Sequence, residues 1–192
     1  MTERAARIVD TLIELDPLAD LPRTGWLLRG VRPCESIAEH SYGVAVTAML
    51  LVDALRDDGV EVDGERVLRM ALLHDAPEAR TGDIPMPQKT PELTRGLDAL
   101  EDDLAGRLLP DPAPWREAHA GDTLEARVVK AADKVQMMTK ALVYGQQGRG
   151  DLHEFWLNEK NFDDRGLDVV REAFALLRAR HADPASWTLG RW

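Results

Sequence analysis

The chain has 192 residues, 44% of them hydrophobic, and a formal net charge of -10 at pH 7. This length can bury one substantial core, so we expect a single domain over residues 1–192, with a core at about 5–145 and C-terminal helices and a tail at 150–192. The negative charge disfavours binding to nucleic-acid polymers, and no stretch approaches the roughly 20 uninterrupted apolar residues of a membrane span. The single cysteine, Cys34, cannot form an internal disulfide, and the N-terminus lacks the apolar core of a signal peptide. We therefore expect a soluble, cytoplasmic protein with no membrane partner.

An amphipathic helix is expected over residues 3–15, because apolar side chains recur there at steps of four and three. The stripe consists of Ile8, Leu12 and Leu15. Pro17 and Pro22 are expected to end this helix. The segment 21–35 has no periodicity and is expected to be a loop.

A capping-box pattern opens the second expected helix. Ser36 and Glu39 have the spacing at which each side chain can bind the other residue's backbone amide. His40 therefore falls in the first turn of this helix, which the Asp-Asp-Gly segment at 57–59 is expected to end.

The third expected helix begins near Glu65 and is apolar enough to lie centrally. Pro77 forbids its simple continuation, so the pair His74-Asp75 is expected in its last turn. The following segment, 80–90, contains a Gly-Asp turn and two prolines and is expected to be irregular.

The second half of the chain also reads as helical. Pro91 is expected to start a helix with a leucine seam that could serve either a core or an interface between subunits. The seam consists of Leu93, Leu97, Leu100, Leu104 and Leu108. A second capping pattern at 122–125 precedes a long helix that carries Asp133 in its middle, and a periodic segment at 167–177 predicts a terminal helix. No segment alternates as a strand would, so the sequence predicts an all-α bundle of about six to eight helices.

Four polar residues of these helices predict a metal site. The pair His74-Asp75 alone is equally typical of a helix cap or a surface pair, but it ends an apolar helix, and Asp133 is flanked by alanine and valine. Buried ionisable groups need a partner or a cation, and a shared divalent ion would serve both helices. With His40, the set has two imidazoles and two carboxylates, which suits a divalent metal that keeps positions open for water and substrate.

The same residues resemble the H…HD…D signature of the HD-domain phosphohydrolases. Finer motifs resemble the branch of that superfamily that contains 5'-deoxynucleotidases. They are PRTGWLLRGV at 22–31, EHS at 39–41, HDAPE at 74–78 and TGDIPMPQK at 81–89. The resemblance implies a helical bundle that holds one divalent ion through His40, His74, Asp75 and Asp133. It also implies a homodimer.

The activity implied by the resemblance is hydrolysis of deoxynucleoside 5'-monophosphates to nucleoside and phosphate by a metal-activated water. The expected partner is thus a small-molecule nucleotide. The expected metal is cobalt, manganese or another transition metal, with magnesium disfavoured. The glutamate that matches Glu78 is catalytic in the family and would activate the water or protonate the leaving 5'-oxygen. The resemblance also places Asp83 beside the reacting phosphate or the leaving oxygen. The alternatives are a solvated carboxylate for Glu78 and a turn residue for Asp83.

Several residues are candidates for substrate binding. Arg23 and Arg29 compete as the phosphate ligand, because a guanidinium matches phosphate oxygens, and Lys89 and Lys130 are alternative cations. Trp26 could wall the ribose or pack in the core. The bacterial nucleotidase pattern has arginine and tryptophan adjacent, whereas two residues separate Arg23 from Trp26 here. This departure leaves the phosphate and sugar contacts open.

The sequence is compatible with two other functions. One is an HD-type hydrolase of a nucleotide diphosphate or phosphodiester, including alarmone-like nucleotides, and the other is a metal- or nucleotide-binding module without turnover. Glu78 and Asp83 argue against the module, because binding alone requires no proton-transfer group. His119 could supply a second metal, but its setting is more typical of an exposed helix end.

Overall fold

Helices form all the regular structure in the part of the chain that the structure, a computed structural model, describes, namely residues 2–85 and 88–188. This confirms the all-α prediction. The α-helices are α1 (Glu3–Leu15), α2 (Thr24–Leu27), α3 (Ile37–Asp57), α4 (Gly64–Leu73), α5 (Glu78–Thr81), α6 (Pro91–Leu108), α7 (Ala113–Ala120), α8 (Leu124–Gln146), α9 (His153–Leu157) and α10 (Asp168–Ala182). Short 3-10 helices are η1 (Asp16–Ala19), η3 (Glu159–Phe162) and η4 (Pro184–Ser186). Among the α-helices of the described residues, α2, α5 and α9 are the short ones, with five residues or fewer.

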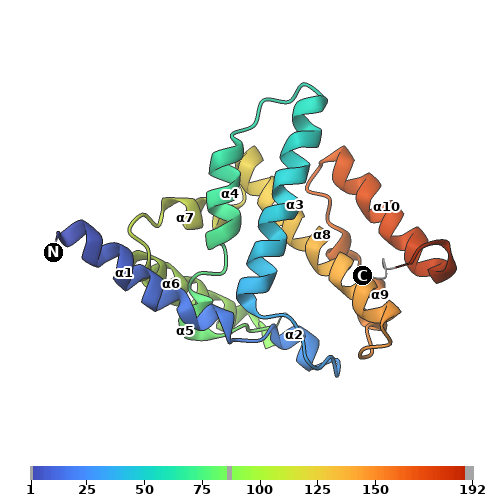
Figure 1. Cartoon of the computed structure of the whole chain (residues 1–192), viewed down its shortest axis with the longest axis horizontal. Coiled ribbons are helices and arrows are strands. Elements are labelled where there is room, and N and C mark those ends of the chain that lie inside the picture. Colours follow the sequence, from blue (N-terminus) through green and yellow to red (C-terminus); the bar gives the residue numbers. More distant parts are fainter. Residues whose placement is uncertain (1, 86–87, 189–192) are drawn as a thin grey trace.

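The long helices α3 and α8 pack against each other at the centre, with α4 and α7 on one side and α10 on the other (Figure 1). On α3 the apolar residues Val44, Ala48, Leu51 and Leu55 recur at helical spacing and are buried. On α8 the buried face includes Ala131, Ala132 and Ala141. Such small side chains let the two helix backbones approach closely, which brings polar residues on the facing turns into reach of one another.

Both predicted capping segments lie at the start of a helix. The Ser36 hydroxyl accepts a hydrogen bond from the Glu39 amide, and the Glu39 carboxylate accepts one from the Ser36 amide. Thr123 caps α8 by accepting from the Ala126 amide. These caps satisfy amides that the helix itself leaves unpaired and fix where each helix begins.

The first helix ends at Leu15, as expected, and Pro17 lies in the 3-10 helix η1 that follows it directly. Two other local expectations were wrong in detail. The expected loop at 21–35 contains the short helix α2. The third helix stops at Leu73, so His74 is its C-cap and Asp75 lies in the turn that follows, rather than both lying in the last helical turn.

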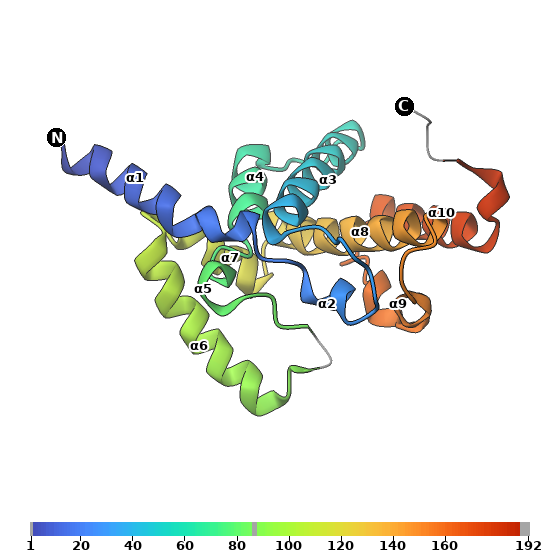
Figure 2. The ribbon, with the colours of Figure 1, turned by 60° about the horizontal axis from the view of Figure 1, so that its bottom comes forward.

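The predicted amphipathic stripe of α1 lies largely in solvent. Ile8 is 54% exposed and Leu12 is 65% exposed, and α1 contributes no buried residue. Figure 2 shows α1 extending away from the rest of the chain, with α6 as its neighbour. In the α6 seam, Leu97 and Leu108 are buried, whereas Leu93 and Leu100 are exposed. None of the helices in the described residues combines the length and the hydropathy that crossing a membrane requires.

Candidate active site

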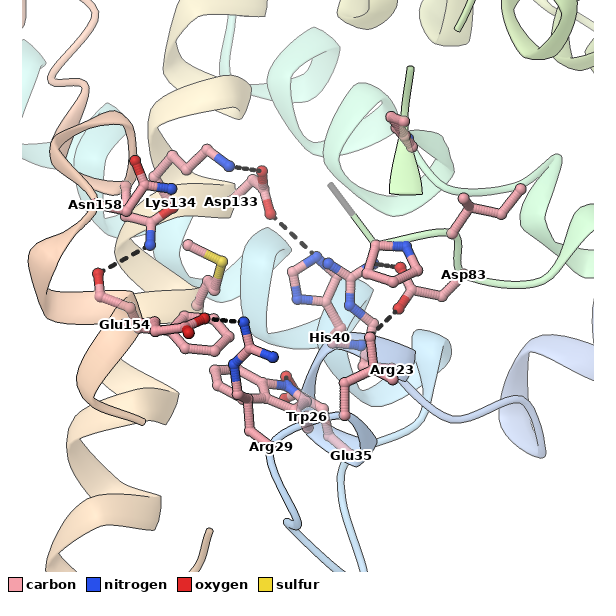
Figure 3. Close-up of a pocket in the computed structure, with 18 of the residues that line it drawn as sticks. Arg23, Trp26, Arg29, Glu35, His40, Asp83, Asp133, Lys134, Glu154 and Asn158 are labelled. Carbon is pink, nitrogen blue, oxygen red and sulfur yellow. Dashed lines mark hydrogen bonds and ion pairs between the residues drawn. The ribbon is translucent and has the colours of Figure 1, made fainter. Parts of the chain in front are cut away.

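The central helices bring the four expected metal ligands to one place. His40 lies in the first turn of α3, His74 caps α4, and Asp133 lies in the middle of α8. Because α3 packs on both α4 and α8, residues far apart in sequence meet at this contact. Figure 3 shows Asp133 and His40 facing each other across it.

The distances define a compact donor set. Ligand atoms of His40, His74 and Asp75 all lie within 4.8 Å of one another. Asp75 Oδ2 is 3.2 Å from His74 Nε2 and 3.7 Å from His40 Nε2. Asp133 lies outside this trio, but its Oδ1 is 3.3 Å from His40 Nε2.

Both imidazoles present a free ring nitrogen to this point. The Nδ1 atom of His74 is 2.7 Å from the Ala71 carbonyl oxygen, and that of His40 is 2.8 Å from the Gln136 side-chain oxygen. Each Nδ1 therefore carries the hydrogen, which leaves the Nε2 lone pairs available. Both Nε2 atoms are buried without a hydrogen-bond partner. Two unpartnered imidazole nitrogens beside carboxylate oxygens fit a divalent transition metal.

Charge at the site is strongly perturbed by burial and by neighbours. Burial alone would raise the pKa of Asp75, but the positive charges of His74 and His40, when protonated, and of Arg23 outweigh it and hold this pKa below its ordinary value. Glu78 behaves in the opposite way, because burial and the adjacent Asp75 raise its pKa to about 10 in the metal-free protein. One site thus contains an ionised carboxylate beside a protonated one, an arrangement typical of acid–base chemistry.

Arg23 is the cation at the centre of these carboxylates. Its Nη1 lies 3.0 Å from Asp75 Oδ2, 3.2 Å from Asp83 Oδ1 and 3.6 Å from Glu78 Oε2. Arg29 lies in the same pocket but forms an ion pair with Glu154. The two arginines that the sequence left as alternatives therefore have different surroundings, and only Arg23 contacts the acidic cluster.

Asp83 joins two loops. Its Oδ2 accepts hydrogen bonds from the backbone amides of Thr24, at 2.5 Å, and Gly25, at 3.4 Å, while its Oδ1 pairs with Arg23. The carboxylate therefore caps the start of α2 from a distant segment and holds the arginine at the site. Met86 and Pro87, which belong to the same TGDIPMPQK motif, lie outside the described residues.

A cavity of about 680 Å³ opens from this cluster. Lys89, Lys130 and Lys134 contribute to its lining, and the α9–η3 segment supplies Phe155 and Asn158 among others. Trp26 also lines it, yet the indole is only 2% exposed. It stacks on Phe155 with ring centroids 4.7 Å apart. Trp26 is therefore a core residue whose edge also borders the cavity.

Sequence reasoning missed Glu35, Gln136 and the α9–η3 wall. Gln136 lies three residues after Asp133 and so on the same helix face, a spacing that could have identified it. Nothing in the sequence of the α9–η3 segment indicates that it reaches the pocket. His119, in the last turn of α7, has a side chain that is 42% exposed and stacks on Trp115, as its exposed setting predicted.

Comparisons with known proteins agree with this arrangement. A family model described as HD domain matches residues 15–169. The chain is 33% identical over 148 residues to the 5'-deoxynucleotidase HDDC2 of Xenopus laevis, which covers 72% of this chain and 71% of that protein.

Solved structures are similar as well. The PH0347 protein from Pyrococcus horikoshii OT3 is 32% identical, with a TM-score of 0.78 over 91% of this chain and 98% of that one. The cyanophage S-2L HD phosphohydrolase DatZ, solved with dA and one catalytic Zn2+ ion, shares the fold at 24% identity, with a TM-score of 0.57 over 89% of this chain and 84% of that one. The chain therefore belongs to the HD domain family.

Proposed function

We propose that this protein is a metal-dependent phosphomonoesterase that hydrolyses deoxynucleoside 5'-monophosphates to nucleoside and phosphate. The observation that carries the proposal is the pair of buried, unpartnered Nε2 atoms of His40 and His74, which face carboxylates at one end of a nucleotide-sized cavity. The relative from Xenopus laevis, named as a 5'-deoxynucleotidase, supports this choice of substrate.

In this proposal His40, His74, Asp75 and Asp133 hold one divalent transition-metal ion. Two nitrogen and two oxygen donors suit cobalt, manganese or zinc better than magnesium, which prefers oxygen ligands alone. A bound ion of this kind lowers the pKa of water and neutralises charge on phosphoryl oxygens.

Three further side chains handle the phosphate and the protons. Arg23 binds the phosphate, because its planar guanidinium lines the cavity beside the proposed metal ligand Asp75. Asp83 keeps that guanidinium in place through its contact with α2. Glu78 exchanges the proton, either with the attacking water or with the leaving 5'-oxygen, and its buried carboxyl has the raised pKa that proton donation requires.

The remaining cavity would hold the nucleoside. Phe155, stacked on the buried Trp26, offers flat apolar surface, and the lysines Lys89 and Lys130 add positive charge along the same cavity. Arg29, tied to Glu154, lies farther from the acidic cluster and would shape the wall near the nucleoside.

A phosphate-release assay on the metal-reconstituted protein tests the proposal. Cobalt, manganese and zinc are each added to chelator-treated protein, and dAMP, dGMP, dCMP and dTMP are compared with the matching ribonucleotides. Release of inorganic phosphate that is lost in His74→Ala supports it. Cleavage of a diphosphate or phosphodiester with no monophosphate turnover would instead favour the rival hydrolase, and metal binding without any turnover would favour a binding module.

We also propose a homodimer that buries the exposed apolar face of α1 together with its neighbour α6. Ile8, Leu12 and Ile13 on α1, and Leu100 on α6, are each at least 46% exposed. Exposed apolar side chains grouped on adjacent helices are typical of association surfaces. Light scattering should give twice the chain mass, and Leu12→Glu should halve it; a monomeric wild-type protein would refute this part of the proposal.

A further inference from the structure

A continuous buried chain of hydrogen bonds leads from the core to His40. Trp26 Nε1 donates to Glu35 Oε1 at 2.8 Å, and Gln136 Nε2 donates to Glu35 Oε2 at 2.9 Å. The Gln136 side-chain oxygen lies 2.8 Å from His40 Nδ1. Glu35, Gln136 and His40 are 3%, 8% and 1% exposed, so water has little access to these bonds.

The donors around Glu35 fix the direction of every hydrogen bond in this series. An indole nitrogen can only donate, and Lys140, whose ammonium is 3.6 Å from Glu35 Oε2, is also only a donor. The Glu35 carboxylate accepts, so Gln136 must turn its NH2 group toward it and its oxygen toward His40. Nδ1 of His40 is then obliged to carry the hydrogen, and Nε2 keeps its lone pair.

Helix α3 is shaped to hold this glutamine. Gly43 lies within the helix, where glycine is a poor helix former. A Cβ atom at this position would lie 2.9 Å from Gln136 Cγ and 3.0 Å from its Nε2. The missing side chain therefore provides the room in which the Gln136 amide crosses toward Glu35.

We propose that Glu35, acting through Gln136, is a positioning residue that sets the tautomer of His40 and so makes this histidine able to bind metal. The inference rests on the proposed role of His40 as a ligand. It adds two residues that are not among the proposed metal ligands, and their effect on metal binding passes through the orientation of one amide.

Glu35→Gln is the decisive variant, because it can reverse the hydrogen bonds from residue 35 to His40 while each of them is kept, with only the ion pair to Lys140 lost. Trp26 still needs an acceptor, so the new amide must turn its oxygen to the indole and its NH2 group to Gln136. Gln136 must then present its oxygen to residue 35 and its NH2 group to His40. Nδ1 of His40 becomes the acceptor, and Nε2 takes the hydrogen.

The first measurement is the tautomer of His40, read from nitrogen NMR of the chelator-treated full chain. In the wild-type protein we expect the hydrogen on Nδ1, and in Glu35→Gln on Nε2. The second measurement is titration with Co2+, where Glu35→Gln should bind on the order of 10- to 100-fold more weakly. Glu39→Gln, an exposed change in the same segment that a capping box tolerates, should alter neither.

A double variant supplies the rescue. In Glu35→Gln with Gln136→Glu, the new glutamate accepts from both His40 Nδ1 and the amide at 35, so the original tautomer and the Co2+ affinity should return. An Nε2 hydrogen in the wild-type protein, or an unchanged tautomer in Glu35→Gln, would overturn the inference and leave the proposed function standing. An inverted tautomer with full Co2+ affinity would also overturn it, and would remove His40 from the proposed ligands.

Discussion

Replacing Glu78 with glutamine should stabilise the metal-free protein and abolish its proposed activity. The side chain is 13% exposed and lies between Asp75 and Asp83, and burial with the adjacent Asp75 raises its pKa to about 10 from an ordinary value of 4.5. Below pH 4.5 both the folded and the unfolded chain keep the proton, so the carboxyl has no net effect on folding there. As the pH rises, only the unfolded chain releases the proton, so stability falls.

The expected magnitude follows from the interval between pH 4.5 and pH 7. Over this range deprotonation stabilises the unfolded chain by about 1.36 kcal/mol per pH unit. The free energy of unfolding therefore falls by about 3 kcal/mol. Glutamine has nearly the same shape and does not titrate, so Glu78→Gln removes this cost. Turnover should fall by about 10²- to 10⁴-fold, because the amide cannot exchange a proton with the leaving group or the water.

Urea unfolding of chelator-treated protein at pH 4.5 and pH 7 measures the effect. The variant should gain stability over the wild type at pH 7 and match it at pH 4.5, and phosphate release by the metal-loaded variant should be nearly lost. Glu39→Gln, at an exposed site, serves as the control. A stability difference that is the same at both pH values would refute the electrostatic argument, and unchanged turnover would remove Glu78 from the mechanism.

Four further outcomes are expected. Arg23→Gln should lower kcat/KM for a nucleotide by about 10- to 100-fold, since a hydrogen bond to a charged group contributes about 1.5–3 kcal/mol, and steady-state kinetics test this. Thr123→Ala removes the cap of α8 and should reduce the free energy of unfolding by about 1 kcal/mol in urea. Gly150→Ala should lower the melting temperature more than Gly59→Ala, because both have positive φ but only at Gly150 would the new methyl lie 2.6 Å from the Arg29 carbonyl oxygen. Metal at 100 times its Kd should stabilise the protein by about 2.7 kcal/mol, and His74→Ala should abolish that gain in thermal unfolding.

The helices and the candidate ligands could be predicted because their signals are local. Ser36 and Thr123 mark helix starts because each caps an amide within four residues of itself. The spacing of the buried apolar residues of α3 follows from the helical repeat. Periodicity alone does not say which helices touch; that His40, His74 and Asp133 meet was predicted from the need of buried ionisable groups for a cation, and from the resemblance.

Contacts between irregular segments could not be predicted in this way. Arg23 and Arg29 lie in one non-periodic stretch. They differ because Arg23 pairs with Asp83, a residue about 60 positions away in sequence. The Asp83 carboxylate was expected beside the phosphate, and its bonds to the α2 amides had no local sign. The helical spacing predicted that α1 has an apolar face. It does not say whether that face packs on the same chain, on another chain or on nothing.

The two sides of the pocket are built from different parts of the fold. Metal binding should therefore tolerate fewer substitutions than substrate preference does. The proposed metal ligands lie on α3, α8 and the end of α4, whose mutual packing is also the core of the fold. Disturbing their geometry therefore disturbs stability. The opposite wall comes from α9 and η3, where Phe155 and Asn158 reach the cavity. Substitutions in this wall can alter which nucleotide fits while the donor set stays intact, so substrate preference should change more readily than metal binding.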